Sequence, residues 1–328
     1  MRVEPDADAA DRDERHLTEL VHGRLTAFLG GHAVVPPPAA LRNPAFHTLA
    51  HAAQRATGRG AADLAVRVRL SAELAAVAER VRTDRGVERV HERWTVGLPG
   101  PRRHLSLSLR RATGRASLLP GLDGRSEPVA VAEWDGARRA ALRDAARLLG
   151  DVWPAMLGEL AAVVREVALL DGPGLDGLTD FAAHGAVFIG AERLRAHPDG
   201  LPGPLGCAEA LVREATRTRC DAAAVIEPFL LPEEPGASGG PPVRGPLRAD
   251  SRPPTALLQR VVVAARTVEL YDRSLRAGAG GAGAPRRRAA LAERGARDSA
   301  ALRVSAGALS PRGRELAEEA SKLLEWSG

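Results

Sequence analysis

The core of this chain has to be built with almost no aromatic side chains, and this limits what it can fold into. Hydrophobic residues make up 45% of the sequence, whereas Phe, Trp and Tyr together make up only 3%. Leu, Val and Ala must therefore fill the core, and Ala- and Leu-rich sequence with Arg and Glu between favours helices. The 328 residues suffice for two domains or one large one. We expect a mainly α protein with a few short β-strands.

The charge of the chain does not point to nucleic acid. The net charge is only +5, acidic residues occur between the basic ones, and Lys322 is the single lysine. The basic runs at 102–103, 110–111 and 286–288 lack the aromatic residues on which bases stack. We therefore expect no nucleic-acid partner.

The sequence also predicts neither export nor membrane insertion. Its first residues, MRVEPDADAADRDERH, are acidic and lack the apolar core of a signal peptide. No apolar run approaches the roughly 20 residues of a membrane span. Cys207 and Cys220 give no CxxC pair and no disulfide framework. We expect a cytoplasmic chain without a membrane partner.

Composition and periodicity divide the chain into three parts. Residues 1–13, acidic and polar, are expected to be a disordered start. Residues 14–130 are expected to form a mainly helical N-terminal region, and residues 131–328 a domain that carries the principal motif. In the N-terminal region, helical spacing predicts helices over 16–28 and up to Thr57.

Two stretches of the N-terminal region alternate apolar and polar residues. Residues 64–70 fit a strand as well as a helix, whereas the remainder of 61–83 fits a helix. The segment HLSLSLRRA, 104–112, has the alternation of a half-buried strand. The sequence therefore predicts a strand at 104–112 and leaves both alternatives open at 64–70.

In the second half, helical patterns dominate. Residues 137–170 predict two helices, the second opened by Pro154, and HGAVFIG at 184–190 predicts a short strand. GAGGAGAP, 278–285, is expected to be a flexible break. Further helices are expected over 205–225, over 254–275 and at the C-terminus, where Ser310 is the N-cap and Pro311 the first helical residue.

The segment LVREATRTRCD, 211–221, resembles the metalloenzyme helix HExxH with arginine at both histidine positions. On a helix, Arg213 and Arg217 share a face one turn apart, and Glu214 keeps the place of the motif glutamate. Arginine stays protonated and has no lone pair to offer a metal. The helix therefore predicts no ordinary transition-metal site.

A purely structural interpretation of this helix stays open. Glu209 and Arg213 form an i,i+4 pair and Glu214 and Arg217 an i,i+3 pair, each worth about 0.2–0.5 kcal/mol on a solvated face. The apolar stripe of the helix lies elsewhere, at Leu205, Ala208, Leu211, Val212 and Ala215.

Four segments resemble the HExxH-type peptide β-hydroxylase family, which modifies ribosomally made peptides. They are HGAVFIG (184–190), CAEALVREATRTRCDAA (207–223), PLRADSRPPTALLQRVVVAARTVELY (246–271) and LSPRGRELAEE (309–319). The resemblance covers residues 133–326 and implies the helical scaffold of that family. It also implies Fe(II) and 2-oxoglutarate as the family's cofactors.

The departures from the family pattern fall on the implied metal ligands. Arg213 and Arg217 replace the two histidines, and Gln259 stands at the third ligand position that the resemblance implies. Fe(II) oxygenases prefer two histidines and a carboxylate, so we predict no cofactor for this chain. The other positions that match the family motifs are Glu214, Arg248, Asp250 and Arg252.

Other candidate site residues are isolated. His47 and His51 lie one helical turn apart, a geometry that suits a metal, but the sequence shows no third ligand. His184 begins the 184–190 strand and is either a structural residue or a cleft residue. Cys220 is either a core-edge residue or a thiol activated by the nearby arginines.

We expect a degenerate member of this family that acts in ribosomal-peptide maturation. It would bind a precursor peptide or another maturation enzyme through an arginine-lined former active-site cleft, using Arg213, Arg217, Arg248, Asp250, Arg252 and Gln259. Carboxylates are the ligands that such arginines prefer.

Two alternatives stay open. The first is a metal-independent enzyme in which Glu214 is the base for proton abstraction, epimerisation or elimination. The second is an active Fe(II)/2-oxoglutarate hydroxylase with a different ligand set. Internal neutralisation of the arginines by Glu209, Glu214 and Asp221 would close the cleft instead.

Overall fold

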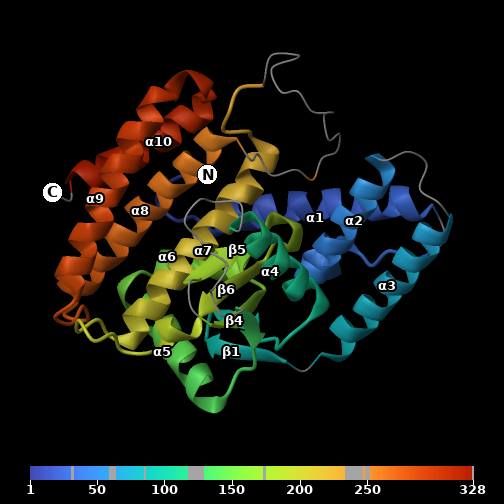
Figure 1. The fold of residues 1–328 in the computed structure, drawn as a ribbon, viewed down its shortest axis with the longest axis horizontal. Helices are drawn as coiled ribbons and strands as arrows, with labels where there is room; N and C mark the ends of the chain where they lie inside the picture. The colour runs from blue at the N-terminus through green and yellow to red at the C-terminus, as the bar shows by residue number, and fades with distance from the viewer. Residues whose placement is uncertain are drawn as a thin grey trace.

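The computed structural model describes residues 1–30, 33–58, 64–84, 86–116, 129–172, 175–232, 247 and 252–326. Helices form most of it, and a small sheet lies in the middle (Figure 1). The N-terminal helices, in blue, lie at one end of the molecule and the C-terminal helices, in red, at the other. The predicted fold class, mainly α with a few short strands, is confirmed.

The sheet is mixed and has the order β1-β2-β4-β6-β5. Its strands are β1 (Val87–His91), β2 (Trp94–Gly97), β3 (Ala130–Ala132), β4 (Glu166–Asp171), β5 (Gly177–Thr179) and β6 (Ala186–Gly190). β4 and β6 pair in parallel in the centre, and β3 pairs with β4 in the antiparallel sense. β5 pairs antiparallel with β6 and forms one edge of the sheet.

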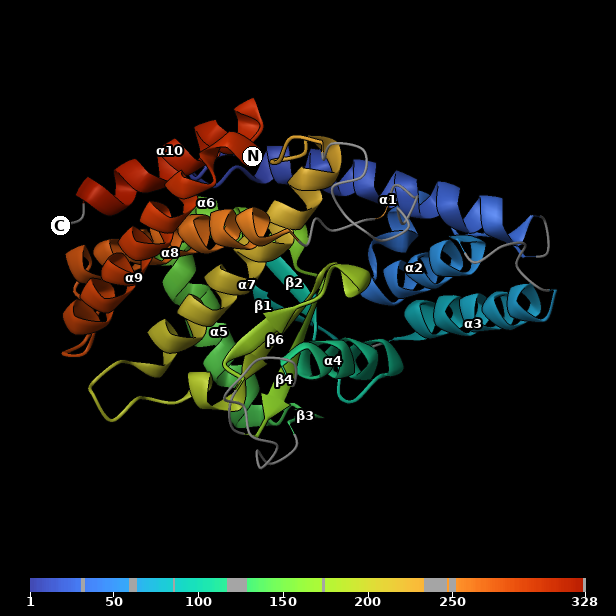
Figure 2. The ribbon, with the colours of Figure 1, turned by 45° about the horizontal axis from the view of Figure 1, so that its top comes forward.

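Both faces of the central strands are covered by helices. Val167 and Leu169 of β4 face the larger core, built with α5 (Gly136–Val152), α6 (Pro154–Val163) and α7 (Gly203–Ile226). Ala168 and Leu170 face a smaller core with α4 (Arg103–Ala116). Figure 2 shows α5 and α7 on one side of the strands and α4 on the other. Strands buried on both faces need continuous apolar sequence, as VALL in β4 and AVFI in β6 provide.

Two helical groups flank this centre. α1 (Ala7–Leu29), α2 (Pro44–Gly58) and α3 (Leu64–Thr83) share a separate core that includes Leu17, Phe46 and Leu74. α8 (Pro253–Arg276) packs against α7, and α9 (Ala284–Val304) and α10 (Pro311–Trp326) pack against α8 as part of the larger core. Short 3-10 turns occur at Pro38–Arg42, Phe181–Ala183, Ala191–Leu194 and Ala306–Ala308.

Most expected elements are present. The strand at 184–190 is β6, the helices over 205–225 and 254–275 are α7 and α8, and Pro154 opens α6. Ser310 caps α10, since its Oγ accepts a hydrogen bond from the Gly313 backbone N–H at 3.1 Å. Turn residues also predict loops at 120–128 and 232–246, and of these 120–128 and 233–246 lie outside the described residues.

The strand predicted at 104–112 is wrong, because this segment is helix α4. Leu105 and Leu109, four residues apart, pack together against the sheet, while Leu107 lies on another side of the helix and lines a pocket. Residues 64–70 are helical too: Leu70, Leu74 and Val77 are buried at helical spacing in α3. An alternating leucine pattern therefore matched a strand while also satisfying the i,i+4 spacing of a helix.

The helix predicted to run to residue 170 is wrong at its end, where β4 begins at Glu166. Because β4 is buried on both faces, its sequence has no alternation to distinguish it from a buried helix. The glycine-rich break at 278–285 begins as a compact turn, and α9, which the sequence did not predict, starts within it at Ala284. Gly278 and Gly281 have φ of 71° and 66°, and the Gly283 N–H donates to the Gly200 carbonyl oxygen at 3.2 Å.

The disordered start predicted at residues 1–13 is also wrong. α1 begins at Ala7, and the carboxylate of Asp6 caps it by accepting from the Ala9 N–H at 2.9 Å. Val3 is buried, and its N–H donates to Glu319 of α10 at 3.0 Å. The acidic composition led to the prediction of disorder, although an aspartate before a helical segment is a signal for a helix N-cap.

A buried ion pair holds this N-terminal segment in place. Arg266 of α8 and Glu159 of α6 are 0% and 2% exposed, with Nη1 and Oε1 2.5 Å apart. Arg266 also donates to the Val3 carbonyl oxygen at 2.8 Å, and Glu159 accepts from the Asp6 N–H at 2.9 Å. The pair therefore connects the chain start to α6 and α8.

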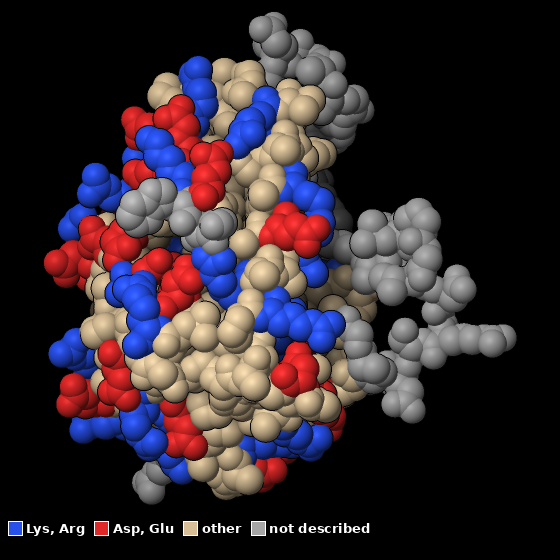
Figure 3. All heavy atoms as spheres, turned by 90° about the vertical axis from the view of Figure 1, so that its left-hand side faces the viewer, with Lys and Arg blue, Asp and Glu red and all other residues tan. Residues whose placement is uncertain are grey.

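The predicted boundary at residue 130 falls inside shared structure. β1 and β2 precede it, and β4 and β6 follow it, yet all four belong to one sheet. No helix in the described part of the chain has the length and apolar character that crossing a membrane requires. On the face seen in Figure 3, basic and acidic residues are interspersed, and neither kind forms a stripe.

Removal of Arg266 is expected to destabilise the whole fold. Arg266→Met leaves Glu159 buried without its main partner, so we expect the free energy of unfolding to fall by about 3–5 kcal/mol in urea denaturation. The matched control is Arg147→Met, whose pair with Asp144 is largely exposed and worth at most about 1 kcal/mol. Adding Glu159→Met to Arg266→Met should recover part of the loss; an additive loss would contradict this account.

Candidate functional site

The motif lies in the middle of α7, a long helix in which most residues are buried. Its residues are Arg213, Glu214 and Arg217. The apolar residues Leu211, Val212 and Ala215 of α7 belong to the larger core. The motif face lies against β5: a Cβ added at Gly177 would come within 3.1 Å of the Glu214 Oε1. The glycine in this edge strand therefore allows the backbone to cover the glutamate.

Glu214 is fully buried and bound by its two arginine neighbours. Its side chain is 0% exposed, and the Nη1 of Arg217 donates to both carboxylate oxygens at 2.9 Å. The Nη2 of Arg213 lies 3.5 Å from Oε1. A base must reach the proton it removes, and here both oxygens are already occupied beneath β5. This geometry disfavours Glu214 as a general base.

Glu209, one turn earlier, is the centre of a second set of contacts. It accepts a hydrogen bond from the Tyr271 hydroxyl at 2.6 Å and one from the Arg287 Nε at 3.1 Å. Nη1 atoms of Arg193 and Arg213 lie at 3.7 and 3.9 Å. Burial raises the pKa of Glu209, but the Arg287 hydrogen bond and charge outweigh it and leave that pKa below its usual value.

Asp176, just before β5, completes the group. It bonds Arg193, and the Arg213 Nη1 lies 3.8 Å away. Burial raises the pKa of Asp176, but the hydrogen bond and charge of Arg193 reverse this and lower it overall. We call the whole group the arginine–carboxylate network: Asp176, Arg193, Glu209, Arg213, Glu214, Arg217 and Arg287.

The network carries one more positive than negative group, four guanidinium groups against three carboxylates. The carboxylates of Glu209 and Glu214 are inside it, and the arginines reach outward: Arg213 is 17% exposed and Arg217 30%. Nε and Nη2 of Arg217 have no hydrogen-bond partner among the described residues. This outer side can donate hydrogen bonds to an anion.

Gln259 and Arg252, two other predicted site residues, make their contacts outside this network. Gln259 donates from Nε2 to Asp221 of α7 at 2.7 Å, and Arg252, just before α8, donates to the Leu231 carbonyl oxygen at 2.9 Å. Burial raises the pKa of Asp221 to about 6. Asp221 thus binds Gln259 instead of neutralising the arginines. Arg248 and Asp250 lie outside the described residues.

The three positions that the resemblance assigns to Fe(II) do not fit that metal. Arg213 and Arg217 present protonated donors that are already directed at carboxylates, and the Gln259 amide is bonded to Asp221. Fe(II) needs imidazole or carboxylate lone pairs at such positions. Within the described ranges, no group of three or more His, Cys, Asp or Glu residues is arranged to hold a metal ion.

His47, His51 and His184 form a buried cluster beside Phe181. The rings of His47 and His184 are 5.4 Å apart, and the Nε2 of His184 is 2.6 Å from Glu14 of α1. Burial, and then the neighbouring His184, hold the pKa of His47 well below its usual value. Burial lowers the pKa of His51 to about 4. His184 is therefore placed in a hydrogen bond within the core.

Cys220 is not an activated thiol. It is 1% exposed, and burial raises its pKa to about 12 despite the charges of Arg266 and Arg219. The proposed activation by Arg213 or Arg217 is wrong, since apolar burial outweighs any nearby guanidinium. Cys220 is a small core residue.

Sequence reasoning missed Tyr271, Arg287, Arg193 and Asp176. The sequence predicted only the local pairs Glu209–Arg213 and Glu214–Arg217, because the other partners come from distant segments. Tyr271 is the only tyrosine of the chain and lies on a buried helix face. The hydroxyl of a tyrosine on a buried helix face needs a hydrogen-bond partner. The sequence could therefore have predicted a polar contact for Tyr271.

Comparison with family models and with curated protein sequences gives no match to this chain. Membership of the peptide-hydroxylase family thus stays a prediction from the quoted segments.

Acid is expected to destabilise the protein through its buried histidines. The pKa values of His47 and His51 in the folded protein lie below the usual 6.5. As the pH falls, these residues are therefore protonated in the unfolded chain before they are protonated in the folded one. The free energy of unfolding decreases as the pH falls from about 6.5 to 4. Each histidine contributes a slope of up to about 1.4 kcal/mol per pH unit. Urea denaturation of His51→Gln across this range should show a shallower slope. His16→Gln, at an exposed position of α1, is the control; an equal change there would refute the assignment.

Asp221 is expected to have the opposite effect on the pH dependence of stability. Its folded-state pKa of about 6 exceeds the usual value near 3.9, so the folded chain holds the extra proton between about pH 4 and 6 and loses stability as pH rises through 6. Asp221→Asn should therefore raise the melting temperature at pH 8 and steepen the acid loss below pH 6. A lower melting temperature at pH 8 would show that the charged form is needed.

Proposed function

We propose that this chain is a non-catalytic binding protein that recognises a carboxylate-bearing peptide through Arg213 and Arg217. The observation that carries the proposal is the buried Glu214, held between two arginines at the positions that histidines occupy in HExxH. In this arrangement α7 holds the guanidinium groups of Arg213 and Arg217 in fixed orientations.

The inner carboxylates hold the arginines in place. Because Glu209 and Glu214 are 0% exposed, they cannot turn outward, and the arginines bonded to them lose rotational freedom before any ligand arrives. Donors fixed in this way lose less entropy on binding. The excess positive group of the network remains for an external anion.

A carboxylate suits this outer side better than other anions of similar charge. The guanidinium fork matches the two oxygens of a carboxylate. Nε and Nη2, the two donors of Arg217 without a partner in the described ranges, form one edge of that fork. A Glu or Asp side chain, or a peptide C-terminus, presents the matching pair of oxygens.

The resemblance to peptide β-hydroxylases gives the biological setting of the proposal. In that setting the ligand is an acidic segment of a ribosomally made precursor peptide, or of another maturation enzyme. Glu214 as a base is the weaker alternative, because the carboxylate is covered by β5 and both its oxygens accept hydrogen bonds.

The test compares binding of acidic peptides with binding of the same peptides after Glu→Gln and Asp→Asn changes, by calorimetry. Candidate precursor peptides encoded near the gene are included. Arg217→Lys keeps the charge beside Glu214 but removes the fork, so we expect about tenfold weaker binding of the acidic peptide, as for loss of one charge-assisted hydrogen bond.

The matched control is Arg195→Lys, an exposed arginine paired with Glu192. Unchanged binding in both variants would indicate general charge attraction and contradict the proposal, as would equal weakening by both or equal binding of acidic and amidated peptides. Glu214→Gln tests the alternative: a mass change in the peptide that disappears in this variant while binding persists would establish Glu214 as a base.

A further inference from the structure

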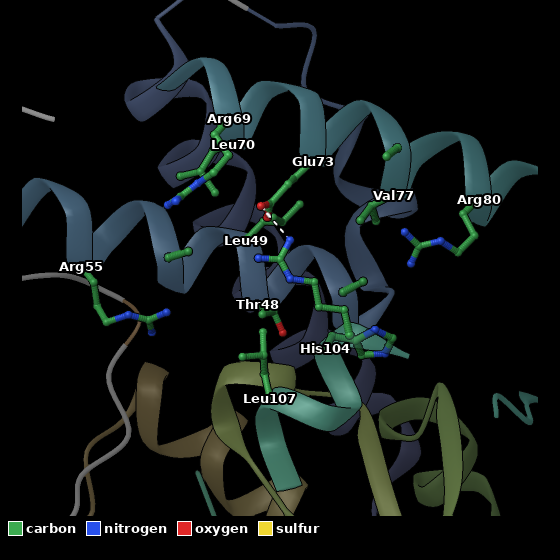
Figure 4. A pocket seen from close by; sticks show the side chains of 14 residues that line it. Thr48, Leu49, Arg55, Arg69, Leu70, Glu73, Val77, Arg80, His104 and Leu107 are labelled. Atoms are coloured by element: carbon green, nitrogen blue, oxygen red, sulfur yellow. Dashed lines mark ion pairs between the residues drawn. The ribbon is translucent and has the colours of Figure 1, made fainter. Parts of the chain in front are cut away.

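A second candidate site lies on the other side of the sheet from the arginine–carboxylate network. A pocket of about 360 Å³ opens between α2, α3 and α4 (Figure 4). Its walls include Leu49 of α2, Leu70 and Val77 of α3, and Leu107 of α4. Small-molecule sites begin at about 300 Å³ and have mostly apolar walls, so this pocket has the size and lining for one small ligand.

The rim of the pocket is strongly basic. Four guanidinium groups and one carboxylate line it, a net charge of 4 − 1 = +3: Arg55, Arg69, Arg80, Arg103 and Glu73. In Figure 4, Arg55 and Arg80 extend toward the opening from opposite sides. An apolar interior with a cationic rim is complementary to a molecule with an apolar chain and an anionic head.

Two of these arginines are well placed for the head group. The Arg103 Nη1 crosses the opening to Glu73, 2.7 Å from its Oε1, and this ion pair is the dashed line in Figure 4. Arg69, one helical turn before Glu73, has no ion-pair partner in the described part of the chain. A carboxylate entering here meets one unpaired guanidinium and a second whose pair is solvent-exposed.

We propose that this pocket binds an amphipathic monocarboxylate of the fatty-acid class. Its acyl chain lies between Leu49, Leu70, Val77 and Leu107, and its carboxylate lies between Arg69 and Arg103. No Phe, Tyr or Trp is among the lining residues, and the one imidazole there, His104, is buried and hydrogen-bonded to Glu166, so the pocket offers no exposed stacking surface to a nucleotide base. The site is independent of the proposed peptide recognition, since it shares no residue with the network.

The test uses a dansyl-labelled undecanoate, whose fluorescence rises in an apolar pocket, with the full-length protein. We expect saturable binding at one site and displacement by decanoate, but little displacement by decanol or decyltrimethylammonium. Arg69→Gln should weaken binding about tenfold, as expected for a lost charge-assisted hydrogen bond. Glu73→Gln removes the one carboxylate among the lining residues and should tighten binding several-fold, so the two variants shift affinity in opposite directions.

The matched control is Arg82→Gln, also on α3 but outside the lining residues. Ala52→Phe fills the pocket and should abolish probe binding while thermal unfolding shows a folded protein. Absence of saturable binding would overturn the site. Equal displacement by decanol and decanoate, or equal effects of Arg69→Gln and Arg82→Gln, would overturn the assignment of a carboxylate head group.

Discussion

A buried guanidinium must have its charge and its hydrogen-bond donors satisfied within the protein, and this requirement organises the fold. Arg266 meets it with the Glu159 carboxylate and with carbonyl oxygens of Arg2 and Val3. The N-terminal segment is thereby fixed against α6 and α8, and α1 begins beside them. The same rule applies along α7, where every buried carboxylate of the network has at least one arginine within ion-pair distance. Apolar packing forms the core, while these pairs fix which segments meet in it.

The same rule explains how α7 can bury Glu214. Two guanidinium groups place positive charge beside this glutamate, and Glu214 compensates for it by binding both. Glu209 does the same for Arg287 and Arg193. The helix thus lies between the sheet and α8 and holds these guanidinium groups as fixed hydrogen-bond donors.

Local patterns in the sequence predicted the long helices α7 and α8, the strand β6 and the Ser310 cap, because each depends on residues close in the chain. The errors at α4, β4 and residues 1–13 share one cause, which is that burial set by distant segments decided the outcome. The contacts of the candidate site also divide into local ones, which the sequence predicted, and tertiary ones, which it did not. The contacts of Glu214 with Arg213 and Arg217 follow from helical spacing, whereas Tyr271, Arg287 and Asp176 reach the network only through tertiary packing.

The two basic features of the molecule differ in how their arginines are balanced. In the network, buried carboxylates hold the guanidinium groups and leave one excess charge, so the recognition proposed there would depend on hydrogen-bond geometry. At the pocket of α2, α3 and α4, arginines surround an apolar interior with one carboxylate among the lining residues, and attraction between opposite charges is the main term. Charges at such an exposed rim are screened by salt, whereas partly buried pairs are screened much less. Ionic strength therefore separates the two proposals: added salt should weaken anion binding at the pocket, whereas the proposed peptide recognition by the network should change less.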